Sequence, residues 1–114
     1  MLKPGANTDP HPDVLHELVR RIVEVAHPLR IILFGSAARG EMGPDSDLDL
    51  LVVMPDGIHH RQVARTVYMA LCGLSMPKDI IVVTEGDIRN YGQNPSLIIA
   101  PALAEGKELY HALG

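Results

Sequence analysis

The sequence predicts an α/β (α+β) fold, with one small β-sheet and helices packed on it. Short apolar runs typical of buried strands alternate along the chain with segments whose apolar residues recur every three or four positions. At 114 residues the chain is long enough for one domain with a substantial core. We expect a flexible lead-in over residues 1–10, which are rich in Pro, Gly, Asn and Asp, and a single domain over residues 11–114.

The first half of the domain is predicted to contain one helix and two strands. The helix begins near Pro12, a residue suited to a first helical turn, and Pro28 ends it. Its apolar positions follow helical spacing: Val14, Leu15, Leu18, Val19, Ile22, Val23 and Ala26. Residues 29–34 and 47–54 are short apolar runs that predict strands, and residues 36–42 between them predict a short helix or turn.

The second half begins with a predicted turn over residues 55–57, which include a Pro and a Gly. An amphipathic helix is expected next, with apolar residues at spacings of three and four: Val63, Val67, Ala70, Leu71 and Leu74. Residues 79–83 predict the third strand. Thr84 and Asp87 resemble a capping pair for a short helix that extends to about Tyr91.

A last helix is expected from Asn94-Pro95, and Gly106 follows its end. Pro101 should kink this helix or mark a late start. Residues 107–111 are compatible with a terminal strand or a helical tail. The sheet therefore has three or four strands.

Composition excludes several classes of protein. With 46% hydrophobic residues, 21% charged residues and no long apolar run, the chain is expected to be soluble, globular and without a membrane span. No basic segment followed by an apolar one opens the sequence, so we expect a cytoplasmic protein. The single cysteine, Cys72, lies among apolar residues in a helical pattern and is predicted to be a small buried side chain rather than a nucleophile.

Charge gives little support to a nucleic-acid-binding role. The net charge is −4, whereas proteins that coat nucleic acids are normally basic. Arg61 and Arg65 lie one helical turn apart and are interpreted as part of a solvated face. His59 and His60 would diverge on a helix, so they make a poor zinc site.

The most informative pattern is Gly35-Ser36, followed after ten residues by Asp47-Leu48-Asp49. Side chains of a strand alternate, so Asp47 and Asp49 share one face. Two carboxylates on one face repel, and a divalent cation such as Mg²⁺, which prefers oxygen ligands, is the common compensation. A Gly-Ser turn beside them offers backbone N–H groups and a hydroxyl that suit a phosphate. Phosphate with metal indicates nucleotide chemistry.

This segment resembles the signature of the DNA polymerase β-type nucleotidyltransferases, and among them it is most similar to the minimal nucleotidyltransferases. The spacing from Gly35-Ser36 to Asp47 and the pair Arg39-Gly40 carry the resemblance. That family has a third carboxylate early in a later strand, where this chain has Asp79. The resemblance implies a mixed rather than an all-parallel sheet.

The resemblance implies that Asp47, Asp49 and Asp79 are the catalytic and metal-binding residues and hold two Mg²⁺ ions. Paired metal ions clamp the attacking and leaving oxygens of an in-line displacement. Asp79 would complete the first metal site or take the proton from the attacking hydroxyl.

The nucleotide-binding residues expected from the same motif are Gly35, Ser36, Arg39 and Ser46. Gly35 leaves room for a triphosphate, and Ser36 either holds the terminal phosphates or only caps a helix. Arg39 can reach the same phosphates or form an ion pair with a nearby acid. Ser46 is expected to shape the approach to Asp47.

The implied reaction transfers AMP from ATP to a hydroxyl, with tyrosine of a partner protein as the expected acceptor. Minimal nucleotidyltransferases are associated with helical HEPN-domain toxins, so the resemblance implies an antitoxin that modifies such a partner. The alternative is a binding module that neutralises or regulates a partner by occlusion. The apolar stretch over residues 95–104, which ends near Leu109 and Tyr110, either packs wholly against its own sheet or forms an interface with the partner, and we predict the interface.

Overall fold

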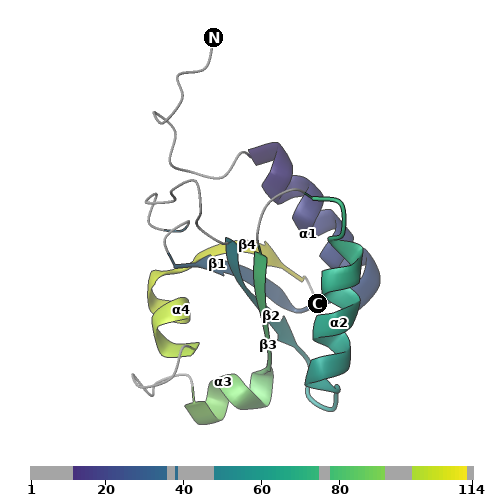
Figure 1. Cartoon of the computed structure of the whole chain (residues 1–114). Helices are drawn as coiled ribbons and strands as arrows, with labels where there is room; N and C mark the ends of the chain where they lie inside the picture. Colours follow the sequence, from purple (N-terminus) through teal and green to yellow (C-terminus); the bar gives the residue numbers. More distant parts are fainter. Residues whose placement is uncertain (1–11, 36–37, 39–47, 75–77, 92–98, 113–114) are drawn as a thin grey trace.

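The computed structural model describes residues 12–35, 38, 48–74, 78–91 and 99–112. Its elements follow the predicted order (Figure 1). They are α1 (Pro12–Ala26), β1 (Arg30–Phe34), β2 (Leu48–Met54), α2 (His60–Ala70), β3 (Lys78–Thr84), α3 (Glu85–Tyr91), α4 (Ile99–Glu105) and β4 (Lys107–His111). No helix in these residues is long and apolar enough to cross a membrane.

The four strands form one mixed sheet in the order β3-β2-β1-β4, which confirms the predicted fold class. β1 pairs antiparallel with both β2 and β4, whereas β2 and β3 are parallel. A parallel pair needs a crossover connection, and α2 lies in the segment that joins β2 to β3. The C-terminal segment is a strand and not a helical tail.

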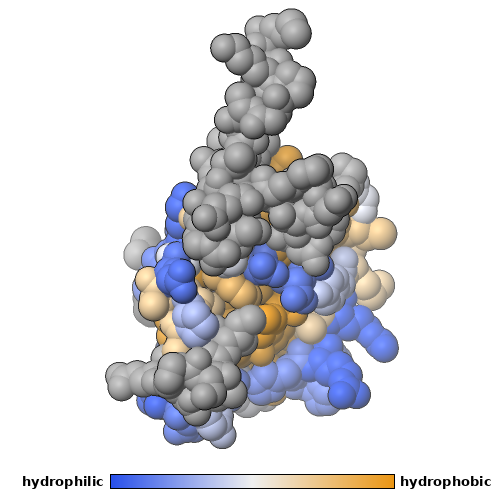
Figure 2. All heavy atoms as spheres, turned by 60° about the vertical axis from the view of Figure 1, so that its left-hand side comes forward, coloured by the Kyte–Doolittle hydropathy of each residue, from blue (hydrophilic) through white to orange (hydrophobic). Residues whose placement is uncertain are grey.

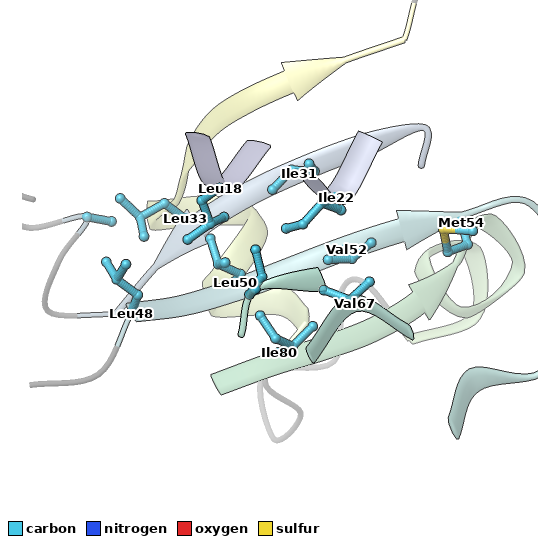
Figure 3. Close-up of a cluster of buried hydrophobic side chains, with 12 residues drawn as sticks. Leu18, Ile22, Ile31, Leu33, Leu48, Leu50, Val52, Met54, Val67 and Ile80 are labelled. Carbon is cyan, nitrogen blue, oxygen red and sulfur yellow. The ribbon is translucent and has the colours of Figure 1, made fainter. Parts of the chain in front are cut away.

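Helices cover both faces of the sheet (Figure 1). α1 and α2 pack on one face, where Leu18 and Ile22 of α1 meet buried side chains of β1 and β2 (Figure 3). α3 and α4 pack on the other face, over a second buried cluster that includes Ile32, Leu51 and Val53. This two-sided burial explains why the strands are apolar almost throughout rather than alternating with polar residues.

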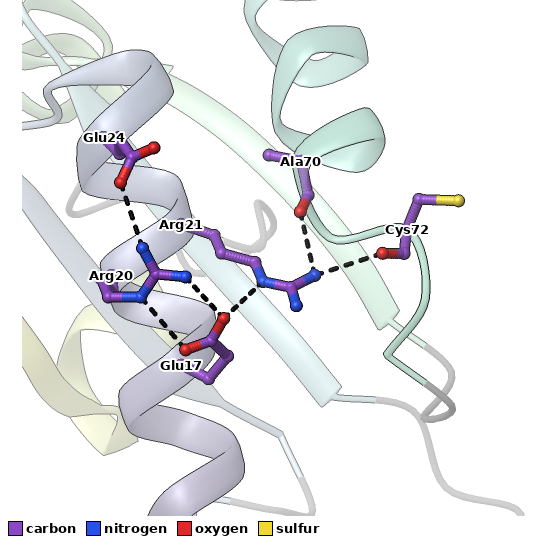
Figure 4. Close-up of polar contacts among 6 residues, drawn as sticks. All are labelled: Glu17, Arg20, Arg21, Glu24, Ala70 and Cys72. Carbon is purple, nitrogen blue, oxygen red and sulfur yellow. Dashed lines mark hydrogen bonds and ion pairs between the residues drawn. The ribbon is translucent and has the colours of Figure 1, made fainter.

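Arg21 ties α1 to the C-terminal end of α2 (Figure 4). Its guanidinium Nη1 donates to the carbonyl oxygens of Ala70 at 3.3 Å and Cys72 at 3.2 Å, and its Nε donates to Glu17 at 2.7 Å. Carbonyls at the end of a helix lack intrahelical partners, so this contact satisfies groups that would otherwise need water. Hydrogen bonds from Arg20 and, to a smaller extent, from Arg21 lower the pKa of Glu17 from 4.5 to about 2.

The prediction that Cys72 is buried is wrong, because Cys72 is exposed. α2 ends at Ala70, and the fully buried Leu71 caps it. The chain then turns through Gly73, whose φ is +95°. Cys72 therefore leaves the helical periodicity that suggested its burial.

The predicted capping pair of α3 is confirmed. The Thr84 N–H donates to Asp87 Oδ2 at 3.0 Å, and the Asp87 N–H donates to Thr84 Oγ1 at 3.1 Å. The His60 ring lies 2.8 Å from the same Asp87 oxygen. Hydrogen bonds from His60 and from the Thr84 backbone hold the pKa of Asp87 below its ordinary value.

The structure describes only residues 99–104 of the interface expected at residues 95–104. Residues 95–98 lie outside the described part of the chain, and in α4 both Ile99 and Ala102 are buried against the sheet. Leu109 and Tyr110 pack against the cluster under α1 and α2. The described apolar residues of this stretch therefore contribute to the domain's own core, and an interface that uses residues 95–98 stays a prediction.

Candidate functional site

The backbone of Gly35 lies directly against the carboxylate of Asp49. Phe34, the last residue of β1, pairs with Asp49 of β2, so the next residue turns over that side chain. Gly35 has a φ of +74°, and a Cβ built on it would overlap Asp49 Oδ2 and lie 3.2 Å from Asp49 Cγ. Only glycine fits here, because the left-handed backbone and the close approach each exclude a side chain.

Asp49 and Asp79 are direct neighbours in the parallel pair of β2 and β3. Residues in register on adjacent strands face the same side of a sheet, and such strands lie about 4.8 Å apart. Asp49 is half-buried and Asp79 is exposed. Both face the α3 and α4 side, because Leu51 and Val83, which share their strand parity, belong to the cluster there.

The ends of three strands therefore converge: the C-terminal end of β1 and the N-terminal ends of β2 and β3. Figure 2 turns the α3 and α4 side of the molecule forward and shows an apolar area framed by hydrophilic side chains. Two carboxylates at such a place repel each other and attract a cation.

Tyr68 of α2 completes the described surroundings of Asp79. Its hydroxyl accepts the Ile80 N–H at 2.9 Å and lies 3.5 Å from Asp79 Oδ1, to which it donates. β3 is an edge strand, so this hydroxyl also covers an otherwise unpaired backbone group. Tyr68 is not among the site residues predicted from the sequence. The one feature of the sequence that could have indicated its role is that this tyrosine directly follows Val67, the buried residue of α2.

Four predicted site residues lie outside the described residues: Ser36, Arg39, Ser46 and Asp47. Among the residues that are described, no group of three or more His, Cys, Asp or Glu side chains could hold a metal ion. The described part of the site thus supplies two carboxylates, Asp49 and Asp79. These oxygen donors suit a hard cation such as Mg²⁺.

A separate pocket of about 360 Å³ lies beside the opposite end of β2. It is lined by Val25, Ala26, Met54, Ile58, His59, Gln62, Val63 and Thr66. None of the predicted site residues lines it. His59 caps α2 by accepting the Gln62 N–H at 3.2 Å, whereas His60 contacts Asp87, so the adjacent histidines have separate structural roles.

Comparison with known proteins identifies a domain family and two solved structures with a similar fold. The model of the nucleotidyltransferase domain family matches residues 14–100. The chain is similar to a solved toxin–antitoxin structure with AMP-PNP, at 19% identity and a TM-score of 0.60, over 86% of this chain and 73% of that one. It is also similar to a "putative nucleotidyltransferase" from Sulfolobus solfataricus, at 26% identity and a TM-score of 0.54, over 68% and 70% of the two chains. No curated protein matches significantly in sequence.

Proposed function

This chain belongs to the nucleotidyltransferase domain family, and we propose that it is a Mg²⁺-dependent enzyme that transfers AMP from ATP to a hydroxyl of a partner protein. The observation that carries the proposal is the register of Asp49 with Asp79, with the backbone of Gly35 held against Asp49. The two neighbouring carboxylates provide anionic oxygens for a cation, and the glycine turn leaves space for a phosphate beside them.

Asp49 and Asp79, with Asp47 from the residues outside the described part, would hold Mg²⁺. Bound Mg²⁺ would neutralise the negative charge that develops on the phosphate oxygens during transfer. The acceptor oxygen forms a bond to the α-phosphorus of ATP, the bond to the pyrophosphate oxygen breaks, and pyrophosphate leaves. Asp79 is the more exposed carboxylate, so it faces an arriving acceptor and takes the proton of its hydroxyl.

The phosphate contacts are assigned to the turn that Gly35 begins. Its left-handed backbone lets the chain approach the triphosphate without a side chain in between. We assign the terminal phosphates to Ser36 and Arg39, and we assign Ser46 to shaping the approach to Asp47.

We further propose that the partner is a helical HEPN-type toxin and that this chain is its antitoxin. The support is the resemblance of the motif to minimal nucleotidyltransferases and the similarity in fold to a toxin–antitoxin structure with AMP-PNP. A tyrosine of the partner is the proposed acceptor.

The test is a transfer assay with the protein, Mg²⁺, ATP labelled on the α-phosphate and the purified product of the adjacent gene. The partner should acquire the label, whereas ATP labelled on the γ-phosphate should give none, because pyrophosphate leaves. Asp49→Asn and Asp79→Asn should each abolish labelling. Asp56→Asn is the matched control, because Asp56 is an exposed carboxylate that contacts Gly86 and Arg89 far from the site.

Neutralisation of the partner without any label, unchanged in Asp49→Asn, would contradict the enzymatic proposal. It would instead identify the chain as a binding module that acts by occlusion.

A further inference from the structure

We propose that the outer face of α2, made of Arg61, Arg65, Tyr68 and Met69, docks an acidic and partly apolar segment of the protein partner. The inference rests on the proposed function for the existence of a protein acceptor, and it specifies where that acceptor binds. On a helix, positions 61, 65, 68 and 69 lie on one side. The other side carries Val67, which is fully buried.

The apolar part of this face is unusually exposed. Met69 is 70% exposed and Tyr68 is 42% exposed, and they are two of the four large hydrophobic residues exposed in the described chain. The other two, Val25 and Tyr91, lie on α1 and α3. A flexible thioether beside an aromatic ring is a surface that adapts well to a protein partner.

The two cations of the face have no carboxylate partner among the described residues, which distinguishes them from the other arginines there. Arg20, Arg21, Arg30 and Arg89 each form an ion pair with Glu or Asp, at 2.6 to 2.9 Å for the shortest contact of each. Arg61 and Arg65 are exposed and form none within the described chain. α2 itself contains no Asp or Glu, although the whole protein has a net charge of −4.

This charge pattern identifies the chemistry of the partner. Carboxylates on a partner helix can pair with Arg61 and Arg65, whose planar guanidinium groups suit bidentate contact. Apolar side chains on the same segment would cover Tyr68 and Met69. A nucleic acid would need a more basic surface than this face, which has only two cations and an exposed methionine, on a protein whose net charge is −4. An acidic protein segment therefore fits this face better than a nucleic acid.

The outer face of α2 adjoins the candidate site through Tyr68. The Tyr68 hydroxyl lies 3.5 Å from Asp79 Oδ1 and accepts the Ile80 N–H from β3 at 2.9 Å. A segment seated on Tyr68 and Met69 would therefore stand next to Asp79. Docking there would place an acceptor hydroxyl near the carboxylate assigned to take its proton.

The test is an NMR titration of the labelled protein with a synthetic helical peptide that carries two Glu residues one turn apart, followed by Leu at the next two positions on the same side. NMR detects weak complexes and reports which residues are perturbed. Chemical-shift changes should concentrate on α2 and the start of β3. Because two exposed ion pairs are lost, Arg61→Ala/Arg65→Ala should raise the Kd about tenfold. Met69→Asp should weaken binding independently.

Arg20→Ala/Arg89→Ala is the matched control, because it removes the same charge from exposed arginines on α1 and α3 and should leave the Kd unchanged. Lack of binding, shifts on another surface, or an unchanged Kd in Arg61→Ala/Arg65→Ala would each overturn the proposal. Tighter binding of a single-stranded oligonucleotide than of the peptide would also overturn it in favour of nucleic acid. The titration needs neither ATP nor transfer, so an inactive site would leave its result intact.

Discussion

Replacing Gly35 with alanine tests whether the close contact between the Gly35 backbone and the Asp49 carboxylate requires a residue without a side chain. The positive φ of +74° should cost a residue with a Cβ about 1–2 kcal/mol. The new methyl group would also overlap Asp49 Oδ2, and pushing that side chain off its rotamer costs about 0.5–1.5 kcal/mol. We expect Gly35→Ala to lower the free energy of unfolding by about 2–3 kcal/mol and to displace a proposed metal ligand.

Gly57 provides a matched control. Its φ is +94°, but nothing lies within 4 Å of a Cβ built there, so Gly57→Ala carries the conformational cost alone. Urea unfolding of both variants, with calorimetric titration of a non-hydrolysable ATP analogue in Mg²⁺, separates the two effects. Gly35→Ala should be about 1 kcal/mol less stable than Gly57→Ala and should lose nucleotide binding, whereas Gly57→Ala should retain it. Equal stabilities together with retained binding in Gly35→Ala would refute the reasoning.

Three further changes probe the contacts that shape the domain. Tyr68→Phe leaves the Ile80 N–H without its partner, so it should lower the free energy of unfolding by about 1 kcal/mol. It also removes the hydroxyl that donates to Asp79, so it should raise the Mg²⁺ concentration needed for nucleotide binding. An unchanged Mg²⁺ requirement would exclude a role of Tyr68 in positioning Asp79. Thr84→Ala removes the cap of α3 and should cost about 1 kcal/mol in urea unfolding, whereas wild-type stability would mean that the cap contributes nothing. The pKa of Glu17 falls from 4.5 to about 2 on folding, so its contribution to stability is complete above about pH 4.5 and disappears as the pH approaches 2. Melting temperatures of Glu17→Gln should therefore fall less steeply with acid than those of the wild type, and parallel pH profiles would contradict the assignment.

Much of the fold follows from local patterns in the sequence. The spacing of apolar residues by three and four predicts α1 and α2, and the short apolar runs predict the strands. The Thr84–Asp87 pair forms the predicted cap because capping depends only on residues close in the chain. Cys72 was misjudged because the end of α2 at Ala70 is set by packing of Leu71 and by the Arg21 contact with α1.

The candidate site was predictable only in part. The spacing of the motif singled out Gly35 and Asp49, and the resemblance to the nucleotidyltransferases singled out Asp79. The structure brings these three described residues together. The role of Tyr68 depends on how α2 packs beside the edge strand β3, which no local pattern encodes. The same holds for Arg61 and Arg65 of α2, which form no ion pair with another described residue, because pairing depends on which acids the fold brings near them.

The most direct measurement of the central claim is a crystal structure with Mn²⁺ in place of Mg²⁺ and a non-hydrolysable ATP analogue, read by anomalous scattering. We expect metal peaks within about 2.2 Å of carboxylate oxygens of Asp49 and Asp79, with the triphosphate against the turn at Gly35. Metal bound elsewhere, or the nucleotide seated in the pocket beside Met54 and His59 at the opposite end of β2, would contradict it.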